Sequence, residues 1–291
     1  MRGTRLWLVI AMIAALFATA LVAGCGDDDD DDATTEETTG EDTAAADFET
    51  IEEGVLSVGT DAPYPPFLTS TPDEADFSGY EVELFNAIAE DLGYDVKYTN
   101  TGFNTIFRDT ANGLFDTAVA SSTIDAEREQ VVDFTDPHYS AENALLVAED
   151  SDIASLDDLD GAIVGTQDGT TQEKFANNET GASEVRGFPG GPDAISALVT
   201  GQVEAVIIEQ PVAADAVEKQ GGVEIVEEIP TGELFGFAVA PDNDGLREAI
   251  NASLATLKED GTMDELYEKY FTIPPPEEVA AGSTNELLTD D

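Results

Sequence analysis

From about residue 54 onward, short apolar runs alternate with segments whose apolar residues recur at helical spacing. The run at 55–59 is typical of a buried strand. The helical stripe at 82–92 follows it and ends at Gly93, a residue type that commonly terminates helices. The alternation continues to about residue 270. Strands that alternate with helices of about ten to fifteen residues indicate an α/β fold, which we expect to have a largely parallel sheet.

Two α/β units of about a hundred residues each are the natural division of this pattern. In the first unit the sequence predicts strands at 55–59, 94–98 and 117–120, and helices at 82–92, 105–111 and 125–130. In the second unit it predicts strands at 162–165, 185–188, 205–208 and 223–226, and helices at 171–176, 190–198 and 212–217. A strand at 236–240 and helices at 245–258 and 263–270 complete the pattern, and the prolines at 274–276 are expected to end the globular part.

The charge of the chain excludes several classes of partner. Its 291 residues include 63 acids and 11 bases, which gives a formal net charge of −52. Nucleic-acid binding requires clustered Lys and Arg to neutralise phosphates, and adhesion to anionic lipid requires a basic face. One cysteine and one histidine leave no intramolecular disulfide and no multi-His or Cys-rich metal site. We therefore expect no nucleic-acid partner and no metal.

The N-terminal residues predict an exported protein held at a membrane. Arg2 and Arg5 precede an apolar stretch at 6–23, whose length lies between a short transmembrane helix and a signal-peptide core. The stretch ends in Leu-Val-Ala-Gly-Cys at 21–25, which resembles the lipobox of bacterial lipoproteins. That resemblance implies cleavage after residue 24 and diacylglyceryl transfer to Cys25. The alternative is an uncleaved anchor that ends in an incidental cysteine.

The segment that follows, residues 25–53, is expected to be a disordered acidic tether. It has an unbroken run of aspartates at 27–32 and almost no apolar residues, so it cannot offset the entropy lost on ordering. The aspartate run lacks the alternate spacing, glycine turn and terminal glutamate of a calcium-binding EF-hand loop. The sequence therefore favours a self-repelling tether over a calcium site.

Nine segments in order, from 58 to 271, resemble the amino-acid-type solute-binding proteins of ABC importers, family 3. The opening resembles the family in Val58-Gly59-Thr60-Asp61 and in Tyr64, Pro66 and Phe67, and Gly-Tyr-Glu-Val-Glu-Leu at 79–84 is similar to another of its segments. The further matching segments are 116–120, 123–128, 132–139, 156–161, 164–171, 257–262 and 267–271.

This resemblance implies a two-lobed periplasmic-binding-protein clamshell of type II. Lobe 1 would comprise 54–140 and 237–272, and lobe 2 would comprise 146–230. Two hinge crossings would lie near 141–146 and 231–238, and 273–291 would form a C-terminal tail. The implied function is that of the extracellular substrate-binding component of an ABC transporter. It would capture a free L-amino acid, polar or cationic, by hinge closure and deliver it to the permease subunits.

The resemblance also implies a localisation and an assembly state. The protein would be a monomer, without cofactor or catalytic residue, anchored by lipid at the outer face of the cell membrane or in the periplasm. An exported dehydratase of the prephenate or arogenate type is an alternative on the same fold, but it needs a positioned general acid, and no motif indicates one. An amino-acid sensor module is a further alternative, for which we expect an additional membrane span or signalling domain.

The resemblance assigns the ligand carboxylate to Arg128, whose forked guanidinium suits bidentate binding. Thr123, Ser121 and Thr170 match positions around the same group, and Gln172 is a weaker match. Without the motif, Arg128 would be read as a surface residue paired with a neighbouring glutamate. Thr170 precedes a helix in the second unit, where backbone N–H groups favour anions.

The remaining candidates surround the ammonium group and the side chain of the ligand. Glu209 ends a buried strand where the family more commonly has Asp, so it would either reach the ammonium or narrow the pocket. Tyr64 and Phe103 match aromatic walls, although either is also explained as core, and Asp61 matches a residue that meets a distal polar group or merely caps a turn. We expect His138 to be structural, and Gln167 and Asp168 to influence specificity.

A serine in place of Cys25 tests the lipobox interpretation. Because the thiol is the acylated group, Cys25→Ser is expected to yield an uncleaved or unlipidated protein. Metabolic labelling with a fatty acid and the mass of the mature protein measure the outcome. Normal processing and normal labelling of the variant would contradict the interpretation.

Overall fold

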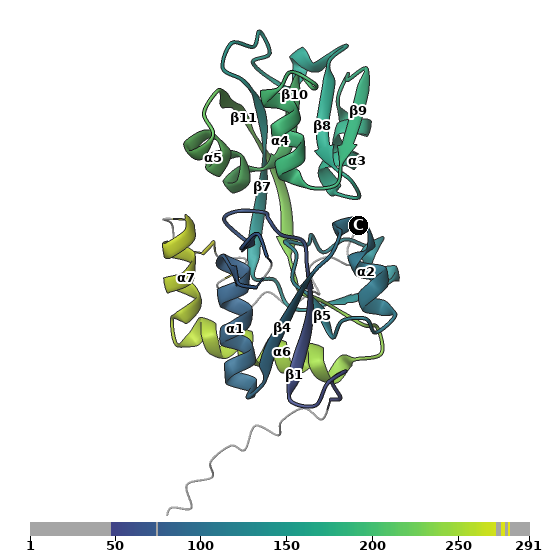
Figure 1. Ribbon diagram of the computed structural model, residues 1–291, viewed down its shortest axis with the longest axis vertical. Coiled ribbons are helices and arrows are strands. Elements are labelled where there is room, and N and C mark those ends of the chain that lie inside the picture. The colour runs from purple at the N-terminus through teal and green to yellow at the C-terminus, as the bar shows by residue number, and fades with distance from the viewer. Residues whose placement is uncertain (1–47, 74, 272–274, 277–278, 280–291) are drawn as a thin grey trace, which may run out of the picture. The chain divides into compact units, whose positions relative to one another are not determined.

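The computed structural model describes residues 48–73, 75–271, 275–276 and 279. The predicted signal peptide, Cys25, nearly all of the tether and most of the predicted tail lie outside the described residues. The described chain forms two five-stranded sheets, in the strand orders β4-β1-β5-β12-β6 and β11-β7-β10-β8-β9 (Figure 1). Within those ranges, no helix is both long enough and apolar enough to cross a membrane.

The first sheet and its helices make up one lobe. The strands are β1 (Val55–Thr60), β4 (Asp95–Asn100), β5 (Thr117–Ala118), β6 (Asp133–Phe134) and β12 (Ala238–Val239). The helices are α1 (Tyr80–Leu92), α2 (Phe103–Ala111), α6 (Asp244–Glu259) and α7 (Thr262–Phe271), with a 3-10 turn η1 (Arg128–Gln130) and a hairpin of β2 (Thr69–Ser70) and β3 (Phe77–Ser78). As the apolar stripe predicts, α1 buries one face, and it ends at Gly93 in the left-handed conformation with φ 77°.

The second sheet and its helices make up the other lobe. The strands are β7 (Tyr139–Ala148), β8 (Ile163–Gln167), β9 (Glu184–Phe188), β10 (Ala205–Glu209) and β11 (Val223–Phe235). The helices are α3 (Thr171–Glu179), α4 (Gly191–Val199) and α5 (Gln210–Lys219), with a 3-10 turn η2 (Leu156–Leu159). Strand β10 is buried along its whole length, as expected for an apolar run in the middle of a sheet.

The α/β class is confirmed, but the expectation of largely parallel sheets is wrong. Strand β1 is parallel to β4 and β5, and β8 is parallel to β9 and β10. In contrast, β12 is antiparallel to both of its neighbours, and β7 is antiparallel to β10 and β11. In each of these two sheets a single strand runs against the others: β7, along which the chain enters the second sheet, and β12, which returns to the first.

The largest difference from the predicted elements concerns β11. The sequence predicts a strand at 223–226, whereas β11 continues to Phe235 past Pro230 and Gly232. A proline is tolerated there because β11 lies at the edge of its sheet, and register shifts interrupt the ladder before Glu227 and before Glu233. The predicted helix at 125–130 is only the 3-10 turn, and Val279, in the predicted tail, is buried in the core.

Strands β7 and β11 connect the two sheets. They are antiparallel partners from the pair Ala148 and Val223 to the pair Tyr139 and Phe235 (Figure 1). Beyond that end the chain joins the first lobe, where the N–H of Gly236 donates to the carbonyl of Ser122 at 3.1 Å. A movement of one lobe against the other therefore has to bend this two-stranded ribbon.

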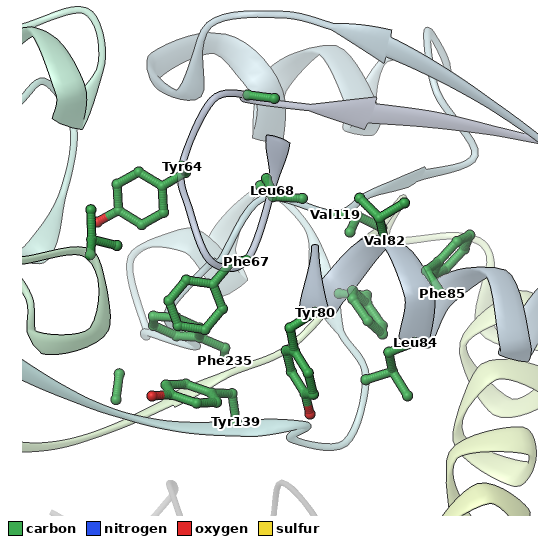
Figure 2. Packing of buried hydrophobic residues seen from close by; sticks show 14 of the residues in the cluster. Tyr64, Phe67, Leu68, Tyr80, Val82, Leu84, Phe85, Val119, Tyr139 and Phe235 are labelled. Carbon is green, nitrogen blue, oxygen red and sulfur yellow. The ribbon is translucent and has the colours of Figure 1, made fainter. Parts of the chain in front are cut away.

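Aromatic residues fix the ribbon to the first lobe. Figure 2 shows Phe67, Tyr80, Tyr139 and Phe235 packed together, with the ring centroids of Phe67 and Tyr139 4.8 Å apart and those of Phe67 and Phe235 5.8 Å apart. Each buried aromatic ring removes about 150–250 Å² from water, so the cluster contributes strongly to stability. Next to it His138 is fully buried, and its ring stacks on Phe237 at 4.1 Å.

Residues 51–276 carry 46 acids and 9 bases, a net charge of −37, which predicts a stability that depends on salt. Mutual repulsion of the acids destabilises the compact state, and raising NaCl from about 10 mM to about 1 M shortens the screening length from roughly 30 to roughly 3 Å. We expect the melting temperature to rise over this range in differential scanning calorimetry. Sucrose at equal osmolality controls for exclusion of solutes from the surface. A flat or falling melting temperature in NaCl would contradict the repulsion argument.

Candidate functional site

One cleft brings together all nine residues that the sequence singles out. They lie at or just after the carboxyl ends of strands β1, β5, β8 and β10, or on the adjoining helices, where α/β sheets commonly bind ligands. Both lobes contribute. The lining residues are Asp61, Tyr64, Phe103, Ser121, Thr123, Arg128, Thr170, Gln172 and Glu209, together with Ala120, Gln167 and Thr171. Their roles toward a ligand remain predictions.

Arg128 is a buried guanidinium at the junction of the two lobes. Its Nη1 donates to the carbonyl of Thr123 at 2.7 Å, and its Nη2 donates to the carbonyl of Gly169 at 3.3 Å. The guanidinium carbon lies 5.1 Å from the ring centroid of Phe103 and 4.9 Å from that of Phe107. Such packing holds the planar group in place, and its Nε also lies 3.4 Å from Oδ2 of Asp125, with which it forms an ion pair. Phe103, predicted as a wall for the ligand side chain, supports Arg128.

The first turn of α3 lies beside this arginine. Thr170 caps the helix, because its hydroxyl oxygen accepts from the N–H of Glu173 at 3.2 Å and its own proton goes to the carbonyl of Gln167 at 2.7 Å. Thr171 and Gln172, which follow the cap, also line the cleft. A helix N-terminus carries partial positive charge and free N–H groups. Together with Arg128 it makes this end of the cleft suitable for a carboxylate.

Glu209 brings a buried carboxyl group to the cleft from the end of β10. Its carboxylate accepts from Gln172 Nε2 at 2.8 Å and from the hydroxyl of Tyr64 in the other lobe. The longer side chain of Glu, in place of Asp, thus reaches across the cleft. Burial, and to a smaller extent the charge of Glu233, raise the pKa of Glu209 to about 8. The Nε2 of Gln172 also donates to Asn143, a buried residue of β7 that sequence reasoning missed.

Asp61 forms a second contact between the lobes. Its carboxylate accepts from Gln167 Nε2 at 2.5 Å. The pKa of Asp61 is raised to about 6, because burial and the nearby charge of Asp193 together outweigh the hydrogen bond from Gln167, which lowers it. Gln167, expected to influence specificity, thus contacts the residue predicted to meet the distal group. Asp168 is not among the residues that line the cleft.

The hydroxyl groups of Ser121 and Thr123 are already engaged by carboxylates outside the lining. Ser121, at φ 48°, donates to Glu81 through both its backbone N–H at 2.8 Å and its hydroxyl at 3.2 Å. Glu81 also lies 2.8 Å from Nε2 of His138. The hydroxyl of Thr123 donates to Glu233 at 2.9 Å. Sequence reasoning named neither Glu81 nor Glu233 as site residues, since their own positions do not reach the cleft lining.

The free space at the centre of the cleft is only about 10 Å³, room for about one water molecule. The side chains of Tyr64 and Glu209, and those of Gln167 and Asp61, contact each other across the remainder of the cleft. Occupation by a larger molecule therefore requires these side chains to exchange their partners. Over the described ranges, no group of three or more His, Cys, Asp or Glu side chains is placed to hold a metal ion.

The lining combines groups of both signs. Arg128 and the start of α3 supply positive charge, and the lining also contains the carboxyl groups of Glu209 and Asp61. A zwitterion matches this pattern, because each of its charges meets an opposite charge in a site shielded from water.

Comparisons with known proteins agree with this geometry. Residues 56–273 match the model of the bacterial extracellular solute-binding proteins, family 3. The histidine-binding periplasmic protein of Escherichia coli K12 is 28% identical over 240 residues, which cover 79% of this chain and 92% of that protein.

Two solved structures share the fold. An ancestral arginine-binding protein bound to glutamine is 37% identical with a TM-score of 0.72, and the match covers 76% of this chain and all of that one. An ancestral amino acid-binding protein described as a precursor of cyclohexadienyl dehydratase is 34% identical with a TM-score of 0.70, over 75% of this chain and 96% of that one. The chain has the two-lobed fold of periplasmic binding proteins and belongs to the bacterial extracellular solute-binding proteins, family 3.

Proposed function

We propose that the protein binds one free L-amino acid in the cleft between its lobes and presents it to the permease of an ABC importer. The observation that carries the proposal is the pairing of a cationic cradle, Arg128 with the N-terminus of α3, with a buried carboxylate, Glu209. In this assignment the cradle holds the ligand carboxylate and Glu209 holds the ammonium group. Binding occurs without chemical change of the ligand.

The charges of the cleft favour a polar or cationic side chain. The lining contains one basic side chain, Arg128, and two acidic ones, Asp61 and Glu209. The charge of Asp193, which lies outside the lining, raises the pKa of Asp61. A ligand with a second positive charge compensates Asp61, whereas an uncharged amide makes hydrogen bonds to Asp61 and Gln167. The relatives named above bind histidine, or are arginine-binding and hold glutamine, and these chemistries fit the same requirement.

The domain arrangement proposed for this cycle follows the two sheets. Residues 54–140 and 237–272 form one lobe, 146–230 form the other, and the crossings near 141–146 and 231–238 bend when the lobes close. The ladder between β7 and β11 supports this assignment. A lipid on Cys25 would hold the monomer at the outer face of the membrane or in the periplasm, and the acidic segment would give it reach toward the permease.

A second candidate function rests on the protonation of Glu209. Because its pKa is raised to about 8, this buried carboxyl carries a proton near pH 7 and faces the cleft, as a general acid does. One relative is described as a dehydratase precursor. Incubation of the protein with prephenate, with detection of the keto-acid product and of CO₂, decides between catalysis and binding. We expect no turnover.

Removal of the Arg128 guanidinium tests the carboxylate assignment. Leaving a charge without its partner in a closed cleft costs about 3–5 kcal/mol, so Arg128→Ala is expected to weaken binding by about two to four decades. In wild type, a ligand at about 100 times its dissociation constant adds about 2.7 kcal/mol, a shift of roughly 5–11 °C in melting temperature. A thermal screen of the twenty amino acids measures both.

Arg108→Ala is the matched control for this variant. Arg108 lies on α2, pairs with Asp109 at the surface and is far more exposed than Arg128. Its loss is expected to leave the ligand response unchanged. The assignment fails if no amino acid shifts the wild-type melt, or if Arg128→Ala responds as the wild type does.

The raised pKa of Glu209 predicts proton release on binding. An ammonium group pairs with the ionised carboxylate, but at pH 7 most ligand-free molecules carry a proton on Glu209, so binding has to expel it. The affinity is therefore expected to rise about tenfold per pH unit from pH 6 to about 7.5, and to level off near 8. Glutamine as the ligand keeps the titration of Asp61 out of the measurement, since its side chain is uncharged.

Calorimetry in two buffers of different ionisation enthalpy measures the released proton directly. We expect close to one proton per ligand at pH 7 and none in Glu209→Gln, which cannot ionise. An affinity that stays constant from pH 6 to pH 8 in the wild type would show that the ammonium group does not meet Glu209.

A further inference from the structure

Glu233 is a carboxylate that contacts the cleft from the hinge ribbon. It follows Gly232 in β11, at the register shift in the ladder with β7. One of its oxygens, Oε2, accepts from the hydroxyl of Thr123 at 2.9 Å and from the hydroxyl of Thr171 at 3.0 Å. Thr123 comes from the first lobe and Thr171 from the second, so a single carboxylate oxygen bonds to both walls of the cleft.

The backbone holds Glu233 at this point. The N–H of Glu233 donates to the hydroxyl of Thr231 at 3.1 Å, and the N–H of Ile124 donates to the carbonyl of Leu234 at 2.8 Å. Thr123 and Phe235 form an isolated bridge. The strand that carries Glu233 is thus attached to the loop that carries Thr123, whereas Thr171 belongs to the other lobe and moves relative to both when the ribbon bends.

The two threonine hydroxyls each have one proton to donate. With both protons directed to Glu233, neither hydroxyl has a proton left for another acceptor in this arrangement. The hydroxyl of Thr171 also lies 3.4 Å from Gln172 Oε1, a longer contact than the one to Glu233. The expectation that the hydroxyl of Thr123 binds the ligand carboxylate stays a prediction, and such binding requires this hydroxyl to leave Glu233.

Electrostatics also place Glu233 next to the two charged groups of the proposed site. Its charge acts on the guanidinium of Arg128 and on the carboxyl of Glu209. It therefore lies where closure of the lobes brings these groups together, although it is not itself part of the cleft lining.

We propose that Glu233 is a positioning residue for ligand binding, which links Thr123 and Thr171 through one carboxylate oxygen and thereby stabilises the arrangement in which both walls of the cleft meet the ligand. This inference rests on the proposed function. Since the link adds stability to the closed arrangement rather than to one ligand, its loss weakens every ligand by the same factor.

Two substitutions separate the reach of the side chain from its charge. Glu233→Asp keeps the charge but is one methylene shorter, so it cannot bond to both hydroxyls. Glu233→Gln loses the charge but keeps a carbonyl oxygen at the same reach. We expect the dissociation constant to rise about tenfold in Glu233→Asp, the equivalent of one hydrogen bond to a charged group, and to stay within about threefold of the wild type in Glu233→Gln.

A double variant tests whether Thr123 acts through Glu233. If it does, Thr123→Val alone lowers the affinity for the ligand. The double variant Thr123→Val with Glu233→Asp then has about the same affinity as whichever single variant binds less tightly. Glu228→Asp, at an exposed glutamate of the same strand, is the matched control and is expected to bind as the wild type does. Titration calorimetry with each amino acid that the wild type binds gives the constants, and the melting temperature of each ligand-free variant reports on the fold.

Three results would overturn the inference while leaving the proposed function intact: Glu233→Asp binding as tightly as the wild type, Glu233→Gln binding as weakly as Glu233→Asp, or losses that multiply in the double variant. Loss of affinity for one amino acid only would also contradict it, since that indicates direct contact with the ligand side chain. A wild-type protein that binds no amino acid would instead refute the proposed function, and the inference with it.

Discussion

The antiparallel pairing of β7 with β11 is the constraint on which the rest of the molecule depends. This ribbon belongs to the second sheet, and the aromatic rings of Tyr139 and Phe235 at its end pack into the core of the first lobe. Every contact across the cleft therefore depends on how the ribbon bends. The second sheet is mixed because β7 runs against both of its neighbours, β10 and β11. Glu233 lies on the ribbon itself, and its carboxylate accepts hydrogen bonds from one residue of each lobe, Thr123 and Thr171.

Balanced charge in a nearly dry cleft is the second constraint. Arg128 packs against the rings of Phe103 and Phe107 and donates to two backbone carbonyls, and Glu209 accepts from Gln172 and from the hydroxyl of Tyr64. These partners satisfy the polar groups of Arg128 and Glu209 as long as no ligand is bound. A bound zwitterion replaces the partners with its own carboxylate and ammonium groups. Burial also explains the proton on Glu209, because a buried carboxyl without a cation beside it is more stable in its neutral form.

Sequence reasoning was successful where a local pattern has one physical meaning. The stripe of α1 and the buried run of β10 predicted their elements well, and the family motifs led to nine side chains that the fold brings to one cleft. It failed where a contact joins distant segments. Nothing local shows that β11 continues past Pro230, because only its place at a sheet edge makes the proline acceptable.

The same limit applies to the groups behind the cleft. Glu81 contacts Ser121 and Glu233 contacts Thr123 across 40 and 110 residues of chain, and single positions in a sequence carry no sign of such pairs. The length of Glu209 was recognised as unusual, but its two outcomes, reaching a partner or narrowing the pocket, could be separated only by finding Tyr64 opposite to it.

A crystal structure of the protein with the amino acid that it binds most tightly tests the central claim most directly. The account predicts a ligand enclosed between the lobes, with its carboxylate at Arg128 and the first turn of α3, its ammonium group at Glu209, and its side chain directed toward Asp61. A ligand bound outside this cleft, or one whose ammonium group lies at Arg128, would contradict the account.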